Sequence, residues 1–298
     1  MLNILICCHN ETVANVPNIF LAPDPDRLRF VVSHQMSQEY ADAHQGEFHL
    51  PEGTDGSVRE ALLRDDVVYS AFVGKGISQN RNHALDTIED YFVKIIPADG
   101  HWDIPIHDGR LINGDVLSIE KALFADDDVR YPDNIVDIVD DIVYEKRHGY
   151  DIFCCKIATP QGQPEFKKYP ENAFVFKEIP LYGDYTVSSI EIGVNLYPII
   201  EEGIRFDEDF GIGSDKWPEG GEETIFLSDC MKANMIVNYS PDYIVEHPYE
   251  STGKGKKTVR KAKMMEAVAI RCKGRRSKAA FIGRLRVIWR QLLSLFGK

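Results

Sequence analysis

The chain has 298 residues, 44% of them hydrophobic, and a net charge of −13. This size and composition suffice for one large domain with a buried core. The opening MLNILICCHNE lacks the basic residues and the long apolar run of a secretory signal, and no segment approaches the ~20 apolar residues of a membrane-spanning helix. We therefore expect a soluble or peripheral protein.

The charge is divided unevenly along the chain. Residues 253–298 contain fifteen Lys and Arg and one acid, Glu266, for a net charge of +14, whereas residues 1–252 carry −27. The acidic part should repel phosphate backbones, so nucleic acid is not an expected partner. We predict a body over residues 1–252 and a basic tail over residues 253–298, with different roles.

The cysteines carry no metal or redox signature, because no CxxC spacing occurs. Four of the six form adjacent pairs in apolar segments, where thiols usually act as small buried hydrophobes. The set is typical of a reducing cytoplasm and consists of Cys7, Cys8, Cys154, Cys155, Cys230 and Cys272.

The first third of the chain alternates strand and helix patterns. Short apolar runs rich in β-branched residues predict strands over residues 2–8, 28–33 and 67–73. Helices are predicted over residues 57–63 and after Ser78, with Ser78 as the N-cap. This alternation indicates an α/β fold with a mostly parallel sheet and helices on both faces.

The pattern weakens over residues 86–113, which we interpret as an irregular insertion or an extra hairpin. A central strand over residues 122–125 and a helix over residues 133–144 are predicted next, the helix being opened by a proline. Two further strands, which we expect to be antiparallel, and a helix are then predicted over residues 151–157, 173–176 and 193–200.

Three consecutive carboxylates, Asp126, Asp127 and Asp128, follow the central strand. In a parallel α/β sheet, ligands bind beyond the carboxyl ends of the strands. Hard cations such as Mg²⁺ or Mn²⁺ prefer oxygen ligands, and they would offset the repulsion between these neighbours. In an extended segment Asp126 and Asp128 share one face while Asp127 points away. The triplet predicts either a metal site or a solvated acidic turn.

A second acidic motif lies in a glycine-rich loop. FDEDFGIG at residues 206–213 is followed by Trp217 and then by GGEET at residues 220–224. Glycines allow the backbone to move or to approach a ligand closely. Glu222 and Glu223 begin an apolar helix, where a carboxylate either complements the helix dipole or acts as a general base.

Together these segments resemble the inverting family 2 glycosyltransferases of the GT-A fold, particularly the bacterial polysaccharide-assembly members. The matching pieces occur in the family's order over residues 1–250. They are the opening strand LNILICCHNE, the segment GISQNRNHAL, the strand end ADDDV, FDEDFGIG with GGEET, and His247-Pro248. The resemblance implies a GT-A domain over residues 1–252.

The resemblance implies roles on the nucleotide side. Asp128 matches the acid of the family's DxD pattern that binds Mn²⁺ or Mg²⁺, and Asp126 matches its companion toward the ribose or the metal. His247 resembles a histidine that completes the metal site in some members, and Arg81 a residue that holds the nucleotide. The strand ends over residues 8–11 and 33–35 should border the nucleobase. Further expected contacts with the nucleotide-sugar come from Cys8, Asn10, Glu11, Gln35 and Asp127.

The resemblance also implies roles on the acceptor side. Glu223 matches the base that deprotonates the acceptor hydroxyl, with Glu222 beside it. The donor would be a nucleotide-sugar, with UDP as the nucleotide, and the acceptor a glycan or a lipid-linked hydroxyl. Additional candidates for acceptor contacts are Asp184, Ser188, Ser189, Glu191 and Trp217. The other interpretation of the segment around Ser189 is a turn followed by a helix cap.

The basic tail has its own pattern. Apolar residues from Phe281 to Phe296 recur at helical spacing and are interleaved with arginines. Such a helix suits an anionic membrane surface. The alternatives are docking on the acidic body of the chain and docking on a partner enzyme. We expect an enzyme in the cytoplasm, peripheral at the inner face of the cell membrane.

Two other functions fit the acidic motifs. A nucleotidyltransferase of similar fold would usually carry a glycine-rich phosphate loop with a basic residue after the first strand, but CCHNETVANVP has neither glycine nor lysine. A catalytically inactive binding or scaffold protein is the second alternative. The presence of Asp126, Asp128 and Glu223 favours an enzyme.

Overall fold

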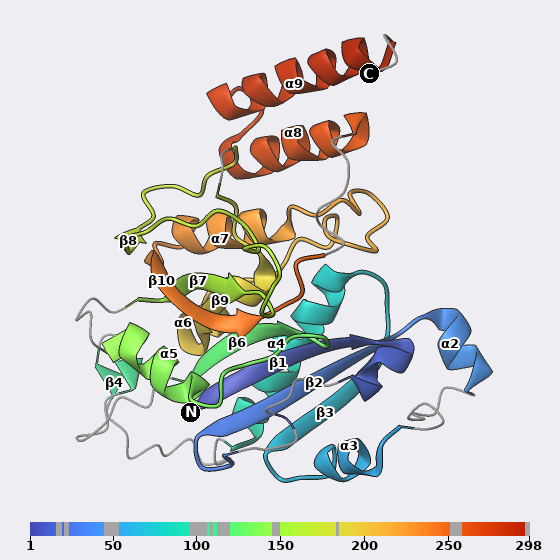
Figure 1. The fold of residues 1–298 in the computed structure, drawn as a ribbon, viewed down its shortest axis with the longest axis vertical. Coiled ribbons are helices and arrows are strands. Elements are labelled where there is room, and N and C mark those ends of the chain that lie inside the picture. Colours follow the sequence, from blue (N-terminus) through green and yellow to red (C-terminus); the bar gives the residue numbers. More distant parts are fainter. Residues whose placement is uncertain are drawn as a thin grey trace.

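The computed structural model describes residues 1–15, 20, 24–44, 54–95, 106–107, 110–111, 120–144, 150–182, 185–250 and 258–295. A mixed sheet of eight strands crosses the molecule in the order β3-β2-β1-β6-β9-β7-β10-β8, and β4 and β5 pair separately (Figure 1). The strands are β1 (Leu2–His9), β2 (Leu28–Met36), β3 (Val67–Val73), β4 (Ile106–His107), β5 (Arg110–Leu111), β6 (Lys121–Asp126), β7 (Ile152–Ala158), β8 (Phe174–Val175), β9 (Ile192–Asn195) and β10 (Val237–Glu246).

Helices connect and flank these strands. They are α2 (Gln38–Ala43), α3 (Gly56–Ala61), α4 (Ile77–Ile95), α5 (Ile135–Tyr144), α6 (Leu196–Glu201), α7 (Glu222–Lys232), α8 (Val259–Lys273) and α9 (Lys278–Leu295), with 3-10 turns η1 (Asn10–Ala14) and η2 (Ser189–Glu191). Helix α4 packs against β1, β2 and β3. None of the described helices has both the length and the apolar character needed to cross a bilayer.

The carboxyl ends of most strands lie along one edge of the sheet. β1, β2, β3 and β6 are parallel. β9 is antiparallel to both β6 and β7, and β10 is parallel to β7, so these last two strands also end at the same edge. The register sets Cys7 opposite Asp126 and His9 opposite Gln35. The fold therefore gathers strand-end residues from distant parts of the sequence.

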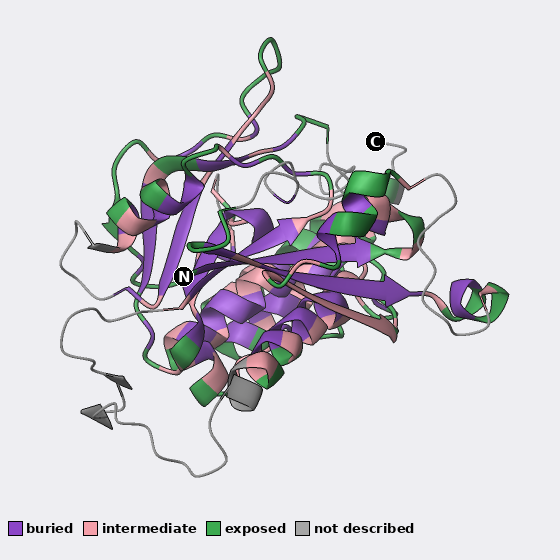
Figure 2. Ribbon diagram, turned by 90° about the horizontal axis from the view of Figure 1, so that it is seen from below, coloured by how far each residue is buried: buried purple, intermediate pink, exposed green. Residues whose placement is uncertain are grey.

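The sheet forms the main core, and its strands are largely buried (Figure 2). A second apolar cluster lies between α7, the loop before it and α8. It comprises Leu181, Phe210, Ile225, Met264, Val268, Ala269 and Cys272. One face of α8 is thus part of a core, so α8 is not a free surface helix.

The basic tail folds into two helices. α8 lies on α7, and α9 lies outermost, on α8 (Figure 1). Arg271 of α8 binds Asp207 at 2.9 Å and Asp229 at 2.8 Å, and Arg260 binds Glu219. α8 therefore docks on the acidic body of the chain, which is one of the alternatives considered for the basic tail.

The predicted fold class is confirmed, since the sheet is mostly parallel and flanked by helices. All six cysteines are buried and free, as expected. Three details were wrong. α4 begins at Ile77, so Ser78 is inside the helix and donates its hydroxyl to the Phe210 carbonyl instead of capping.

The helix after Ser78 is longer than predicted, because Asp86–Ile95 still belong to α4. Within the insertion, the described residues form the short pair β4 and β5. Strand β9 occupies residues that were predicted as the start of a helix, and the helix α6 begins only at Leu196. Of the two strands expected to be antiparallel, β8 is antiparallel to β10, whereas β7 is antiparallel to β9 but parallel to β10.

Gly193 on β9 offers a test of core packing. A Cβ at this position would lie 2.0 Å from the ring of the buried Phe153, the paired residue on β7. We predict that Gly193→Ala lowers the free energy of unfolding by about 1–3 kcal/mol, the usual cost of overpacking. Gly56→Ala is the control, because its Cβ would meet no atom within 4 Å. Equal urea midpoints for the two variants would contradict the packing described here.

Candidate functional site

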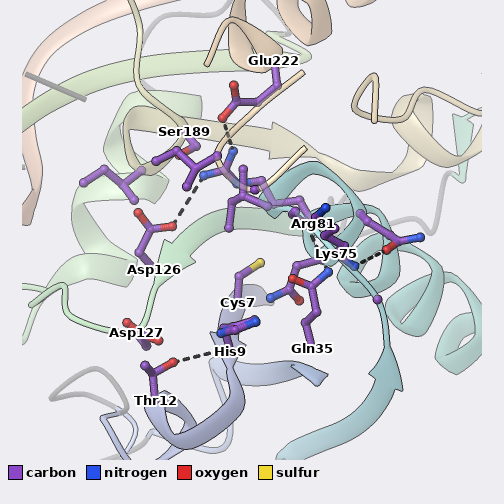
Figure 3. A pocket seen from close by; sticks show the side chains of 18 of the residues that line it. Cys7, His9, Thr12, Gln35, Lys75, Arg81, Asp126, Asp127, Ser189 and Glu222 are labelled. Carbon is purple, nitrogen blue, oxygen red and sulfur yellow. Dashed lines mark hydrogen bonds and ion pairs between the residues drawn. The ribbon is translucent and has the colours of Figure 1, made fainter. Parts of the chain in front are cut away.

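The carboxyl edge of the sheet contains a cavity of about 1040 Å³. Its walls come from the ends of β1, β2, β3 and β6, from the start of α4, from η2 and from the start of α7 (Figure 3). The cavity brings together the acidic triplet, Arg81, the Glu222–Glu223 pair and His247, which are far apart in the sequence.

Arg81 is the buried centre of this cavity wall, with 4% of its side chain exposed. Its Nη1 donates to Glu222 Oε1 at 3.1 Å, and its Nη2 donates to Ser189 Oγ at 2.6 Å. The same Nη2 lies 3.6 Å from Asp126 Oδ1 (Figure 3). Burial opposes the charge, but Asp126, Glu222 and Glu223 raise the pKa of Arg81, so it stays a cation.

The helix that carries Arg81 is anchored on both sides. Asn80 donates its amide to the Cys8 carbonyl of β1 at 2.8 Å. Asn82 donates to the Phe206 carbonyl and accepts from the Phe206 amide, which fixes the loop before α7. The start of α4 therefore ties the first strand to the glycine-rich loop, and Arg81 points between them.

Two glycines permit that close packing. Gly76 has φ +91° and Gly213 has φ +84°. A Cβ on Gly76 would lie 3.1 Å from the Ser214 nitrogen, and one on Gly213 would lie 3.0 Å from the Gly76 Cα. Positive φ and backbone-to-backbone approach both favour glycine. The loop before α7 thus rests directly on the loop before α4.

The three aspartates have three different partners. Asp126 faces Arg81, whereas Asp128 Oδ2 lies 3.5 Å from His247 Nε2. Asp127 interacts with the Thr12 side chain, and Thr12 in turn accepts from the His9 amide. Residues 127 and 128 form a turn, so the alternation expected of an extended segment ends at Asp126.

The environments of these acids differ accordingly. Burial raises the pKa of Asp127 to about 6, the carboxylates on either side add to this rise, and the Thr12 hydroxyl opposes it. The interaction with His247 lowers the pKa of Asp128, and the same interaction raises the pKa of His247. Asp127 does not point away from the site, as the strand pattern had suggested, but lines it.

The predicted metal ligands are not gathered into one cluster. Among the residues that the structure describes, no group of three or more His, Cys, Asp or Glu side chains could hold a metal ion. Asp128 and His247 form a pair, but Asp126 is turned toward Arg81. His247 Nδ1 lies 2.7 Å from the Pro248 carbonyl and must donate to it, which leaves Nε2 facing Asp128.

The two glutamates have separate environments. Glu222 is 3% exposed and pairs with Arg81, although its Oε2 has no hydrogen-bond partner. Glu223 is half-buried and lines the cavity. Burial and the neighbouring Glu222 carboxylate raise the pKa of Glu223, and Arg81 opposes the rise. Glu222 therefore holds the arginine, while Glu223 is available to a bound molecule.

At the β1 end, the cavity is lined by only some of the predicted residues. Cys8 is fully buried, and Asn10 binds Ser37 by accepting from its amide at 2.9 Å. Cys8, Asn10 and Glu11 do not line the cavity, whereas the predicted His9 and Gln35 do, together with Cys7 and Thr12. Side chains alternate along a strand, so Cys7 and His9 share the face opposite Cys8.

The acceptor candidates are also separated by the structure. Ser189 lines the cavity and accepts from Arg81. Glu191 is fully buried and pairs with Lys167 at 2.6 Å, and Trp217 packs against Phe210 outside the cavity lining. Asp184 lies outside the described residues.

Several lining residues were not predicted. They are Ser37, Gln38, Val73, Lys75, Gln79, Phe166, Ile190, Ile212 and Glu250. Ser37 and Gln38 follow β2, Val73 ends β3 and Lys75 follows it, so the rule that ligands bind at strand ends could have indicated them. Phe166 and Ile212 lie in irregular segments, where no periodic pattern marks them.

Known proteins share the fold of the chain. It is similar to the crystal structure of S. aureus TarS 1-349 in complex with UDP-GlcNAc, with a TM-score of 0.50 and 13% identity over 91% of this chain and 66% of that chain. A second structure of TarS 1-349 gives a TM-score of 0.52 at 14% identity, over 91% and 64%. A complex of TarS 1-349 with UDP gives 0.50 at 13% identity, over 91% and 64%.

TarS is a GT-A family 2 glycosyltransferase. At these identities the likeness shows the fold, and the chain therefore has the GT-A fold that its motifs suggested. The chain spans less than two thirds of the length of these TarS structures. No family model and no curated protein matches it.

The buried arginine predicts a stability effect. We expect Arg81→Met to lower the free energy of unfolding by about 3–5 kcal/mol, because it leaves the Glu222 carboxylate buried without a counterion. Adding Glu222→Gln to Arg81→Met should recover part of the loss, since the buried charge is then removed. Urea denaturation of the two variants measures both effects. A double variant less stable than Arg81→Met would contradict the pairing.

Proposed function

We propose that the protein is an inverting glycosyltransferase that moves a sugar from a nucleotide-sugar, with UDP as the nucleotide, to an acceptor hydroxyl. The observation that carries this proposal is one cavity lined by both the strand-end acids Asp126–Asp128 and the carboxylate of Glu223. The fold supports it, because similar solved structures of TarS contain UDP-GlcNAc or UDP.

The donor would bind along the strand ends. His9 and Gln35 are neighbours in register at the ends of β1 and β2, and they offer polar groups for the nucleoside. The diphosphate would lie toward Asp128 and His247. Arg81 is buried behind Asp126 and holds that carboxylate, so we assign it a positioning role, not a direct phosphate contact.

The residues present fit a divalent metal. Asp128 offers a carboxylate oxygen, and His247 offers Nε2, since its Nδ1 donates to the Pro248 carbonyl. Mn²⁺ or Mg²⁺ typically takes one or two protein ligands and completes its shell with water and substrate phosphates. Such an ion would supply positive charge to the diphosphate leaving group. Asp128 and His247 would hold it in this protein.

Glu223 is proposed as the base. It lies at the start of α7 and reaches the cavity, whereas its neighbour Glu222 is occupied by Arg81. A carboxylate with a raised pKa is a stronger base once it has lost its proton. Glu223 would remove the acceptor proton as the hydroxyl oxygen bonds to the anomeric carbon of the sugar and the bond from that carbon to the diphosphate oxygen breaks, releasing the nucleoside diphosphate. This is a single displacement with inversion, and it needs no covalent sugar–enzyme intermediate.

We also propose a glycan or lipid-linked acceptor and a position in the cytoplasm, at the inner face of the cell membrane. The support is the basic tail, whose net charge of +14 would be attracted to anionic lipid. Ser189 is the acceptor candidate that lines the cavity, beside Arg81.

Donor binding can be tested without knowing the acceptor. We expect UDP-sugars to raise the melting temperature in the presence of Mn²⁺ and to do so less in EDTA, because the metal would join the diphosphate to Asp128. Asp128→Asn should remove the dependence on Mn²⁺. Thermal-shift assays with a panel of nucleotide-sugars measure this. If no nucleotide-sugar stabilises the protein at any metal concentration, the donor site is wrong.

Glu223→Gln tests the base. We expect a loss of transfer of about 100-fold or more, as is typical of removing a general base, with donor binding unchanged. In the wild type, the rate should rise with pH well above the ordinary range of a glutamate, because the raised pKa keeps Glu223 protonated until a higher pH. Glu222→Gln is the comparison variant, and unlike Glu223→Gln it should lower the free energy of unfolding. Normal turnover by Glu223→Gln would refute the role.

A further inference from the structure

Helix α9 presents its bulky apolar side chains outward. Five of them recur on one face of the helix and are between 45% and 61% exposed: Phe281, Leu285, Ile288, Trp289 and Leu292. We call this set the α9 face. The opposite side of the helix, toward α8, carries the small or buried residues Ala280, Gly283 and Val287.

The orientation of the α9 face is fixed by contacts on the other sides of the helix. Gly283 allows α9 to approach α8 closely, because a Cβ there would lie 2.9 Å from the Glu266 Cα. Arg284 binds Glu266 at 3.1 Å, and the Arg286 guanidinium lies 4.2 Å from the centre of the Tyr182 ring. The helix is thus held by its small side and its flanks, and its large apolar side is the one left exposed.

The charges around this face have one sign. Between Gly274 and Leu295 there are six basic residues and no acid: Arg275, Arg276, Lys278, Arg284, Arg286 and Arg290. α8 engages its own acids of the body, since Arg260, Arg271 and Lys273 pair with Glu219, Asp207, Asp229 and Glu178. Of the six cations, Arg284 pairs with Glu266 of α8. Among the residues that the structure describes, no acid forms an ion pair with the other five, and their charge favours an anionic partner from outside the chain.

We propose that the α9 face is a docking surface for an anionic lipid bilayer, with the helix lying in the plane of the interface. A helix with aromatic and aliphatic residues on one side and arginines on its flanks buries the first among the acyl chains and keeps the second at the headgroups. A second copy of the chain is disfavoured as the occupant, because two α9 faces would bring two sets of these basic residues together. This inference rests on the membrane location proposed above and not on the transfer reaction.

Contacts of α8 fix how this surface relates to the cavity. Gly221, the residue before Glu222, has φ +97°, and a Cβ there would lie 2.6 Å from Val268 Cγ2 of α8. The docking helix is therefore one helix away from the start of α7, where Glu223 faces the cavity (Figure 1). A bilayer held by α9 would lie on the side of the molecule that carries the proposed base.

Vesicle binding by the full chain tests the proposal, with no nucleotide-sugar present. Deletion of the helices is unsuitable, because it would uncover the apolar cluster around Val268. The variant is Leu285→Glu/Trp289→Glu, and the matched control is Leu63→Glu/Ile236→Glu, which places the same changes on exposed apolar residues elsewhere. Melting temperature and donor binding are measured for both.

We expect the wild type and the control to sediment with phosphatidylglycerol–phosphatidylcholine vesicles and not with phosphatidylcholine alone. The α9 variant should bind the anionic vesicles about tenfold or more weakly, since withdrawing one large apolar side chain from burial has roughly this effect. Its melting temperature should be unchanged.

Three results would overturn the proposal. The first is that the α9 variant binds anionic vesicles as well as the wild type does. The second is that the wild type binds both kinds of vesicle equally, or binds neither kind. The third is that the wild type is a dimer and the α9 variant is a monomer. The last would make a second copy the occupant. A failure of the transfer reaction would instead appear in the donor-binding and turnover assays and would leave vesicle binding intact.

Discussion

The guanidinium of Arg81 lies where four parts of the chain meet: α4, the end of β6, the η2 turn and the start of α7. A buried cation is costly unless hydrogen-bonding partners surround it, and removing one partner costs far more than an exposed ion pair would. Asp126, Ser189 and Glu222 must therefore stay in place around it. This requirement fixes the distance between the strand-end acids and the proposed base.

Much of the fold could be predicted from sequence because β1, β2, β3 and β6 are short apolar runs bounded by polar turns. The strand β9 could not, because its pairing with β6 and β7 depends on contacts far away in sequence and its four residues carry no periodic signal. The length of α4 was underestimated because charged residues are mixed among the apolar ones in Asp86–Ile95, so the helical pattern weakens there although the helix continues.

The candidate site was predicted in outline and not in its contacts. Strand-end logic indicated Asp126 and Asp128, the family resemblance indicated Gln35, and all three line the cavity. Side-chain alternation failed after Asp126, where the chain turns. The choice of Glu223 over Glu222 came from the resemblance, and the residue pattern alone did not separate the two. The sequence offers no sign that Arg81 is buried, since the carboxylates that surround it come from residues 45 and 141 positions away.

The contact between Gly221 and Val268 has a consequence for cooperativity. The backbone at the start of α7 makes its left-handed turn in close contact with α8, so the two segments should open together in local unfolding. Amide exchange at Glu222 and Glu223 would then follow the stability of α8, not that of the sheet. A tail that looks like an appendage in sequence is, in these terms, part of the folding unit that holds the proposed catalytic carboxylate.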